Sequence, residues 1–220
     1  MKRRIAALSA LVADLLACAF AWSRLPERPA VHWNLRGEAD RYGSRLEIVL
    51  LGPALILGVW LLMEVLLKVD PKRVAAQRNA EATPEERNGT IDLVVAVVLA
   101  LVAVAHGLSL LAASGLLTDP PRAQALLLAA FLLIAGNFFA RLRPSWFVGI
   151  RTPWTLSSDD VWRRTHRLAG RLMVPAGLIG IPVALALPGA RALVVVVVLT
   201  LASLCGPAVW SYFAWRSREA

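Results

Sequence analysis

Long apolar runs alternate with short polar segments along the whole chain. Six of these runs extend over roughly twenty residues each, at positions 5–22, 46–69, 91–117, 123–140, 168–187 and 192–215. An α-helix of about 20 residues crosses the roughly 30 Å of hydrocarbon in a bilayer. The pattern therefore predicts an all-α, polytopic membrane protein with six transmembrane helices.

Turn residues separate several of the runs, as in "TDPPR" at 118–122 and "PGAR" at 188–191. Connections this short require the two helices that they join to lie antiparallel. We therefore expect the third and fourth spans, and the fifth and sixth spans, to form helical hairpins.

The polar segment before the fifth span has the period of an amphipathic helix. In "SSDDVWRRTHRLAGRLM", residues 157–173, Ser157 is the expected N-cap and Asp160 lies three residues later. At 100° per residue one face collects Trp162, His166, Ala169 and Met173, and the other collects Arg163, Arg164, Arg167 and Arg171. We predict a short interfacial helix with Trp162 at the membrane surface and the arginines on anionic headgroups or on a partner protein.

Basic residues are distributed unevenly between the two sides of the predicted membrane. The chain has 24 Lys and Arg residues and a net charge of +9, and 17 of the 24 fall at the chain ends, in 68–87 and in 141–171. Because cytoplasmic loops are rich in Lys and Arg, both termini and residues 141–171 are predicted to be cytoplasmic, and residues 24–45 to face outward. This topology explains the basic charge, and we expect no direct binding of nucleic acid.

The first apolar run imitates a secretory signal, with basic residues at its start and a lipobox-like "LLAC" that ends at Cys18. Asp14 lies in the middle of this run, where a carboxylate opposes insertion of a signal segment. We therefore expect a retained first helix.

Asp14 and His106 lie near the middles of the first and third spans. A charge at the centre of a membrane helix costs about 2.5 to 3.5 kcal/mol on insertion scales, so neither side chain should face lipid. Two roles stay open for a pair of these residues, namely packing alone or the transfer of a proton. Glu64 and Asp92 lie nearer the predicted cytoplasmic ends of their spans, where their side chains can extend to the membrane surface or pair with loop arginines.

Two polar loops carry distinctive residues. In "GIRTPWTL", residues 149–156, Gly149 permits unusual backbone angles, Pro153 keeps Thr152 extended, and Arg151 offers five donors. One interpretation is a folded-back loop that needs no ligand, in which Arg151 caps helix-end carbonyls and Trp154 inserts between helices. The alternative is a binding site for an anion or a peptide.

The second polar loop is the outer loop, residues 24–45. We expect a packed turn around Gly37 in this loop, with His32 bonded to backbone and Trp33 at the membrane interface.

Known catalytic and metal-binding patterns are absent from the sequence. There is no zinc-protease, serine-hydrolase or phosphate-loop motif, and His32 has no second ligand at metal-binding spacing. We expect no catalysis, no metal and no cofactor. A small proton-coupled transporter stays open as an alternative function because of Asp14 and His106.

Residues 136–173, "GNFFARLRPSWFVGIRTPWTLSSDDVWRRTHRLAGRLM", resemble the signature of the SdpI family of bacterial immunity proteins. Residues 25–45 resemble a domain of unknown function that precedes the signature in that family. Ser145 departs from the asparagine expected after the proline, so a hydroxyl would replace an amide that ties the loop to a helix end. The resemblance implies a multipass protein of the bacterial plasma membrane that gives resistance to a hydrophobic antimicrobial peptide toxin. It also implies sensing of the toxin, with a cytoplasmic autorepressor held at the membrane.

The resemblance assigns candidate residues and a division of the chain. The binding or signalling candidates are Asn137, Arg151, Thr152, Pro153, Trp154, Thr155, Trp162, Thr165 and His166. The regulator-docking candidates are Arg163, Arg164, Arg167 and Arg171, and those of the outer loop are His32, Trp33 and Gly37. We expect a two-helix unit at 1–69, a cytoplasmic linker at 70–90, and a four-helix unit at 91–220 that contains the signature loop, residues 141–171.

Overall fold

Six long helices form most of the chain in the computed structural model, which describes residues 2–34, 36–72, 74 and 84–217. These helices are α1 (Lys2–Trp22), α2 (Arg45–Val69), α4 (Pro84–Ala113), α5 (Pro120–Phe139), α7 (Asp159–Ala186) and α8 (Gly189–Arg216). Each is long and apolar enough to cross a membrane, which confirms the six predicted spans. Residues 75–83 of the predicted linker lie outside the described part.

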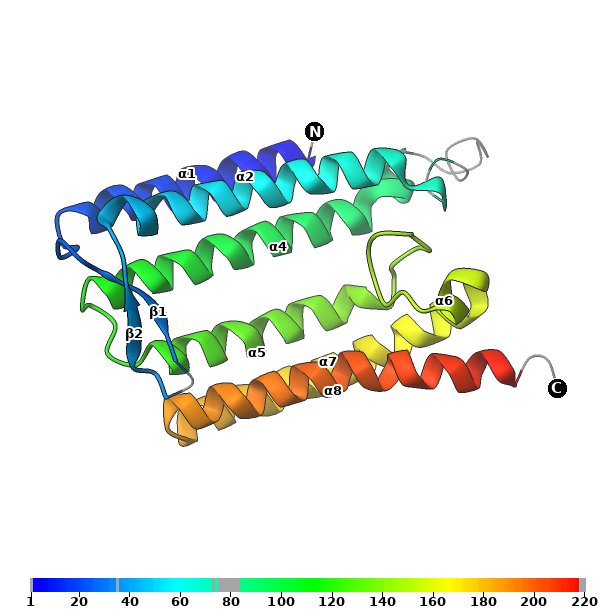
Figure 1. Cartoon of the computed structure of the whole chain (residues 1–220). Coiled ribbons are helices and arrows are strands. Elements are labelled where there is room, and N and C mark those ends of the chain that lie inside the picture. The colour runs from blue at the N-terminus through cyan, green and yellow to red at the C-terminus, as the bar shows by residue number, and fades with distance from the viewer. Residues whose placement is uncertain (1, 35, 73, 75–83, 218–220) are drawn as a thin grey trace.

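The six helices pack as two groups of three (Figure 1). Helices α1, α2 and α4 contact one another, as do α5, α7 and α8, and the two groups meet where α4 contacts α5. The start of α1, the end of α8 and the signature loop lie at one end of the bundle. Which side of the membrane this end faces stays a prediction from the charge distribution.

Local turn chemistry sets the ends of the third and fourth spans. Helix α4 ends four residues earlier than predicted, because Gly115 has a φ of 71° and the Leu116 N–H donates to the Leu111 carbonyl at 2.9 Å. Helix α5 begins with Pro120 because the Asp119 carboxylate accepts from the Arg122 N–H at 3.1 Å.

The predicted interfacial helix is not a separate element, because α7 is continuous from Asp159 to Ala186. Ser157 is not its N-cap: it ends the short helix α6 (Pro153–Ser157), and Ser158 caps α7 by accepting from the Val161 N–H. The predicted apolar face is the buried one, consisting of Trp162, His166, Ala169 and Met173. Since Trp162 is completely buried, the prediction that it anchors at the membrane surface was wrong.

Small residues bring α5 and α7 into close contact. A Cβ on Gly170 would lie 2.8 Å from the Gly136 carbonyl oxygen, and one on Gly177 would lie 2.6 Å from the Ala129 carbonyl oxygen. Such approaches of one backbone to another are typical of helix pairs in membranes. They fix the position of α7, whose first turns lie beneath the signature loop.

The outer loop forms a β-hairpin that the sequence analysis did not predict. Strands β1 (Ala30–Trp33) and β2 (Ala39–Tyr42) pair antiparallel across the end of the bundle opposite the signature loop (Figure 1). In the turn, the Asn34 side-chain oxygen accepts from the backbone N–H groups of Arg36 and Glu38. Gly37 has a φ of 82°, and a Cβ there would lie 2.8 Å from Pro121, so the tip of the hairpin touches the start of α5.

Two side chains of the hairpin differ from expectation. His32 bonds through Nδ1 to the Asp40 carboxylate at 2.6 Å rather than to backbone. Trp33 is partly buried against the cluster that contains Cys18 and Leu110 at the ends of α1 and α4, rather than lying free at the interface. The first contact joins the two strands of the hairpin, and the second packs the hairpin against the bundle.

Candidate functional site

Asp70, at the C-terminal end of α2, anchors the signature loop. Its buried carboxylate accepts from the Ser145 hydroxyl at 2.6 Å and from the Trp146 N–H at 3.1 Å. The Ser145 oxygen in turn accepts from the N–H groups of Phe147 and Val148. The hydroxyl thus ties the loop to a helix end, in the role expected for an amide at this position.

His166 lies at the centre of the folded loop. Its ring stacks on Trp162 at a centroid distance of 4.0 Å and on Phe139 at 5.3 Å. Nε2 accepts from the Ile150 N–H at 2.9 Å, and Nδ1 donates to the Trp162 carbonyl at 2.9 Å. Because one partner is a donor and the other an acceptor, His166 is a neutral imidazole with its proton on Nδ1. The Trp162 indole donates to the Leu142 carbonyl at 2.8 Å, which closes the loop over α7.

Gly149 makes this closure geometrically feasible. Its φ is 116°, in a region that side-chain-bearing residues rarely adopt, as the sequence predicted. A Cβ at this position would lie 2.5 Å from Nε2 of His166 and 2.9 Å from the Trp162 ring. The loop backbone therefore reaches the histidine only with glycine here.

Helix α6 is attached to α8. Thr152 caps α6, and its hydroxyl lies 2.9 Å from the Ser211 hydroxyl on α8. Thr155 is buried and donates to the Ile150 carbonyl at 2.9 Å. Trp154 is half-buried and meets Tyr212 edge to face at 5.1 Å, so this end of the loop is packed against α8.

The candidate residues fall into two sets. The inner set is buried and consists of Thr155, Trp162, Thr165 and His166. The outer face, which is at least partly exposed, consists of the candidates Arg151, Thr152, Pro153 and Trp154, and Trp146 joins them although the sequence did not single it out. Arg151 donates to the Trp146 carbonyl at 3.2 Å, a loop carbonyl rather than the helix-end carbonyl that was predicted. Asn137 belongs to neither set, because it is exposed on α5 and donates to the Leu133 carbonyl.

Sequence reasoning missed Asp70 and Trp146. Asp70 lies 75 positions before Ser145, and no local pattern connects the two residues. The signal available for Trp146 was its place beside the proline and serine of "RPSW". Its side chain is 46% exposed, so it contributes to the outer face rather than to the packing.

Asp14 and His106 form a second polar site, buried between α1, α2 and α4. The Asp14 carboxyl and Nδ1 of His106 lie 2.7 Å apart, and Nε2 of His106 lies 2.8 Å from the Ile48 carbonyl. A carbonyl only accepts, so Nε2 carries a proton. The distance of 2.7 Å places Nδ1 and the carboxyl so that they share one hydrogen bond.

Helix α2 is shaped to receive this pair. A Cβ on Gly52 would overlap the His106 ring, so glycine creates the space. Pro53 has no N–H to donate to the Val49 carbonyl, and the Cys18 thiol lies 3.5 Å from that oxygen instead. Cys18, Asp14 and His106 bring metal-ligating atoms within 4.8 Å of one another, but both ring nitrogens already have protein partners.

Arg3 pairs with two carboxylates near the ends of α2 and α4. It lies 3.3 Å from Glu64 and 2.7 Å from Asp92. The partner is thus an arginine of α1 rather than one of the loop arginines that were expected.

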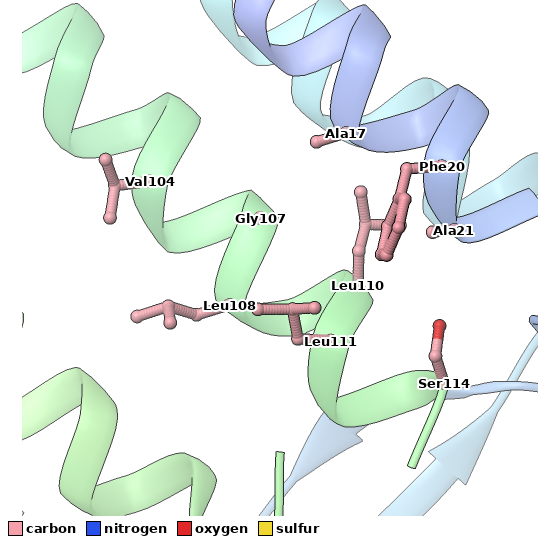
Figure 2. A pocket seen from close by; sticks show the side chains of 9 residues that line it. All are labelled: Ala17, Phe20, Ala21, Val104, Gly107, Leu108, Leu110, Leu111 and Ser114. Atoms are coloured by element: carbon pink, nitrogen blue, oxygen red, sulfur yellow. The ribbon is translucent and has the colours of Figure 1, made fainter. Parts of the chain in front are cut away.

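A third candidate site is an apolar pocket (Figure 2). It has a volume of about 270 Å³ and lies between α1 and α4, where Ala17 and Gly107 follow Asp14 and His106 along their helices. Phe20, Leu108 and Leu111 contribute to its apolar lining. The shape and chemistry suit a hydrocarbon group.

Known protein families match two segments of the chain. Residues 141–211 match the SdpI/YfhL protein family, and residues 10–57 match a domain of unknown function (DUF1648). The chain is 33% identical over 86 residues to "Immunity protein SdpI" of Bacillus subtilis (strain 168), a similarity that covers 39% of this chain and 41% of that protein. No solved structure matches the chain.

The matched segments coincide with the two structural sites. Residues 10–57 include Asp14 and the Gly52 position that receives His106, and residues 141–211 include the signature loop and its Ser211 anchor on α8. Six apolar helices and these matches together identify the chain as a multipass bacterial membrane protein that is similar to the SdpI/YfhL family over residues 141–211.

Proposed function

We propose that the protein gives a bacterial cell resistance to a hydrophobic peptide toxin that acts on its membrane. The similarity to an immunity protein is the observation that carries this proposal. The proposed mechanism is interception of the peptide in or beside the bilayer, and it needs no catalytic step.

The outer face of the signature loop is the proposed contact surface. Trp146 and Trp154 present aromatic rings and Arg151 presents a positive charge. Tryptophan and arginine are among the residue types that contribute most of the binding energy in protein interfaces. The hydrogen bonds of His166, Trp162 and Asp70 hold this face in one conformation. A preorganised surface of this kind loses little entropy when a peptide binds.

Arg151→Ala is expected to lower the toxin concentration that kills half of the cells by tenfold or more, about the effect of losing one central contact. Arg151 is exposed and makes one loop hydrogen bond, so the substitution should leave folding intact. The matched control is Arg143→Ala, another exposed arginine of the same loop, which should protect like the wild type. Survival would be measured at equal membrane abundance.

The toxin for this assay is chosen as one against which the Bacillus subtilis immunity protein protects the same strain. Equal loss of protection in the Arg143 and Arg151 variants would contradict a specific contact. Full protection by both variants would show that Arg151 is not part of the contact surface.

A proton-coupled transporter is the second candidate function, favoured by the buried, hydrogen-bonded pair of Asp14 and His106 and by the apolar pocket between α1 and α4 (Figure 2). Asp14→Asn is expected to abolish energised efflux of the peptide, because an amide keeps a hydrogen bond to His106 but cannot release a proton. Efflux of a fluorescent toxin derivative from energised vesicles would be measured. Unchanged efflux in the variant would exclude this mechanism.

The sensing role implied by the resemblance would require the arginines of α7 to hold a cytoplasmic repressor. Arg163 and Arg164 are both 3.8 Å from the Asp160 carboxylate, and no contact among the described residues points to a protein partner. This role rests on the resemblance alone.

A further inference from the structure

Three arginines of α7 and one tryptophan of α8 line a groove on the surface of the bundle. Arg164, Arg167 and Arg171 share one side of α7, since residues three and four apart are neighbours on a helix. Leu168 and Trp210 complete the lining of a cavity of about 290 Å³. The Arg164 guanidinium lies 5.4 Å from the centre of the Trp210 ring.

The positive charge of this groove is largely uncompensated. Arg164 shares the Asp160 carboxylate with Arg163, and each nitrogen–oxygen distance is a long 3.8 Å. Arg167 and Arg171 have no ion pair or hydrogen bond with any residue in the described part of the chain. None of the five lining residues is acidic. The groove therefore offers guanidinium groups that an external anion can neutralise.

The groove lies at the edge of the hydrocarbon layer. Helices α7 and α8 are joined by Leu187 and Pro188 alone, so their adjoining ends lie at the same depth. A helix crosses the hydrocarbon layer in about 20 residues. The stretch of α7 of this length that ends at Ala186 begins at Arg167, so Arg167 lies at the opposite edge of the layer. The stretch of α8 of the same length that begins at Gly189 ends two residues before Trp210. Trp210 therefore also lies at this edge, and tryptophan is a residue type that favours the membrane surface.

Arg171 lies one helical turn, about 6 Å, on the hydrocarbon side of Arg167. A guanidinium at this depth is costly unless its side chain extends to a phosphate at the surface. A soluble anion or a cytoplasmic protein would meet Arg167 from the water side but would leave the apolar wall of Leu168 and Trp210 exposed. A phospholipid matches both halves of the groove.

We propose that this groove is a binding site for an anionic phospholipid, whose phosphate is held by Arg167 and Arg171, whose headgroup lies beside Trp210 and whose acyl chain continues past Leu168 into the hydrocarbon layer. Arg164, beside Trp210, contacts the outer part of the headgroup. The site is independent of toxin resistance and gives the arginines of α7 a ligand within the bilayer.

The test titrates the purified full-length protein in nonionic detergent with phosphatidylglycerol or with phosphatidylcholine of the same chains, and records the melting temperature. The wild type is expected to be stabilised at lower concentrations of phosphatidylglycerol than of phosphatidylcholine. Arg167→Gln/Arg171→Gln should require about 25-fold more phosphatidylglycerol, roughly fivefold for each arginine. Arg143→Gln/Arg163→Gln removes two exposed charges at the same end outside the groove, and should titrate like the wild type.

Three results would overturn the proposal. The first is an equal response of the wild type to the two lipids, and the second is an equal shift in the two double variants. The third is stabilisation by inorganic phosphate alone that matches phosphatidylglycerol, since it would indicate a soluble anion. If Arg167→Gln/Arg171→Gln does not fold, Arg167→Gln alone carries the test, with an expected shift of about fivefold.

Discussion

Replacing His106 with leucine is expected to lower the free energy of unfolding by about 3 to 5 kcal/mol. The substitution leaves the Asp14 carboxyl without its partner among α1, α2 and α4, and it also leaves the Ile48 carbonyl without a donor. Removing one member of a buried pair costs more than the pair contributes, because the remaining group stays in a low-dielectric environment. Unfolding would be measured in mixed micelles of increasing denaturing detergent.

A graded series separates the pair from general packing. Asp14→Asn should be mild, because the amide donates to Nδ1 of His106 while Nε2 keeps its bond to Ile48. The double variant Asp14→Leu/His106→Leu should be more stable than His106→Leu alone, since no buried carboxyl remains. Equal destabilisation by His106→Leu and Asp14→Asn would contradict the described hydrogen bonds.

Gly149→Ala is expected to destabilise the protein by about 2 to 5 kcal/mol and to reduce toxin resistance. Part of the cost is the positive φ of 116°, and part is the loss of the Ile150 N–H donor at the buried His166 ring. Unfolding in denaturing detergent and proteolysis of the signature loop would both be followed.

The control for this change is Gly206→Ala, on α8. A Cβ there would meet no atom within 4 Å, so stability and resistance should stay at the wild-type level. A Gly149→Ala protein with an intact, protease-resistant loop would show that the loop does not depend on the left-handed conformation at this position.

The six spans could be predicted from the sequence because each long apolar run has one stable arrangement in a membrane, a helix that satisfies its own backbone. The helix ends were harder to predict, since they depend on single residues such as Gly115 and Ser158. The hairpin was missed because strands of four residues carry little periodic signal, and its position depends on a contact between Gly37 and Pro121.

The two polar sites differ in how far the sequence could predict them. The structure shows the pairing of Asp14 with His106, which the sequence had suggested because a lone charge is costly in lipid. For Trp162, composition favoured the membrane surface, but the Leu142 carbonyl supplies an interior acceptor for its indole. The Asp70–Ser145 bond joins segments that only the folded chain brings together.

The folded loop also separates residues that the signature alone treats as equivalent. His166 and Trp162 are buried and hold the loop together, whereas Arg151 and Trp146 are exposed. A substitution in the buried group should change stability and resistance together, whereas one on the outer face should change resistance alone. This distinction defines which variants can report on toxin contact.

The most direct test of the proposed function records membrane potential in a sensitive bacterium exposed to a hydrophobic peptide toxin that the Bacillus subtilis immunity protein neutralises. Cells that carry this protein would be compared with empty-vector cells and with cells that carry the Bacillus subtilis protein, at matched membrane abundance. Retention of the membrane potential by cells with this protein, while empty-vector cells depolarise, is the predicted result. Depolarisation as rapid as that of empty-vector cells, with the Bacillus subtilis protein still protective, would contradict an immunity function.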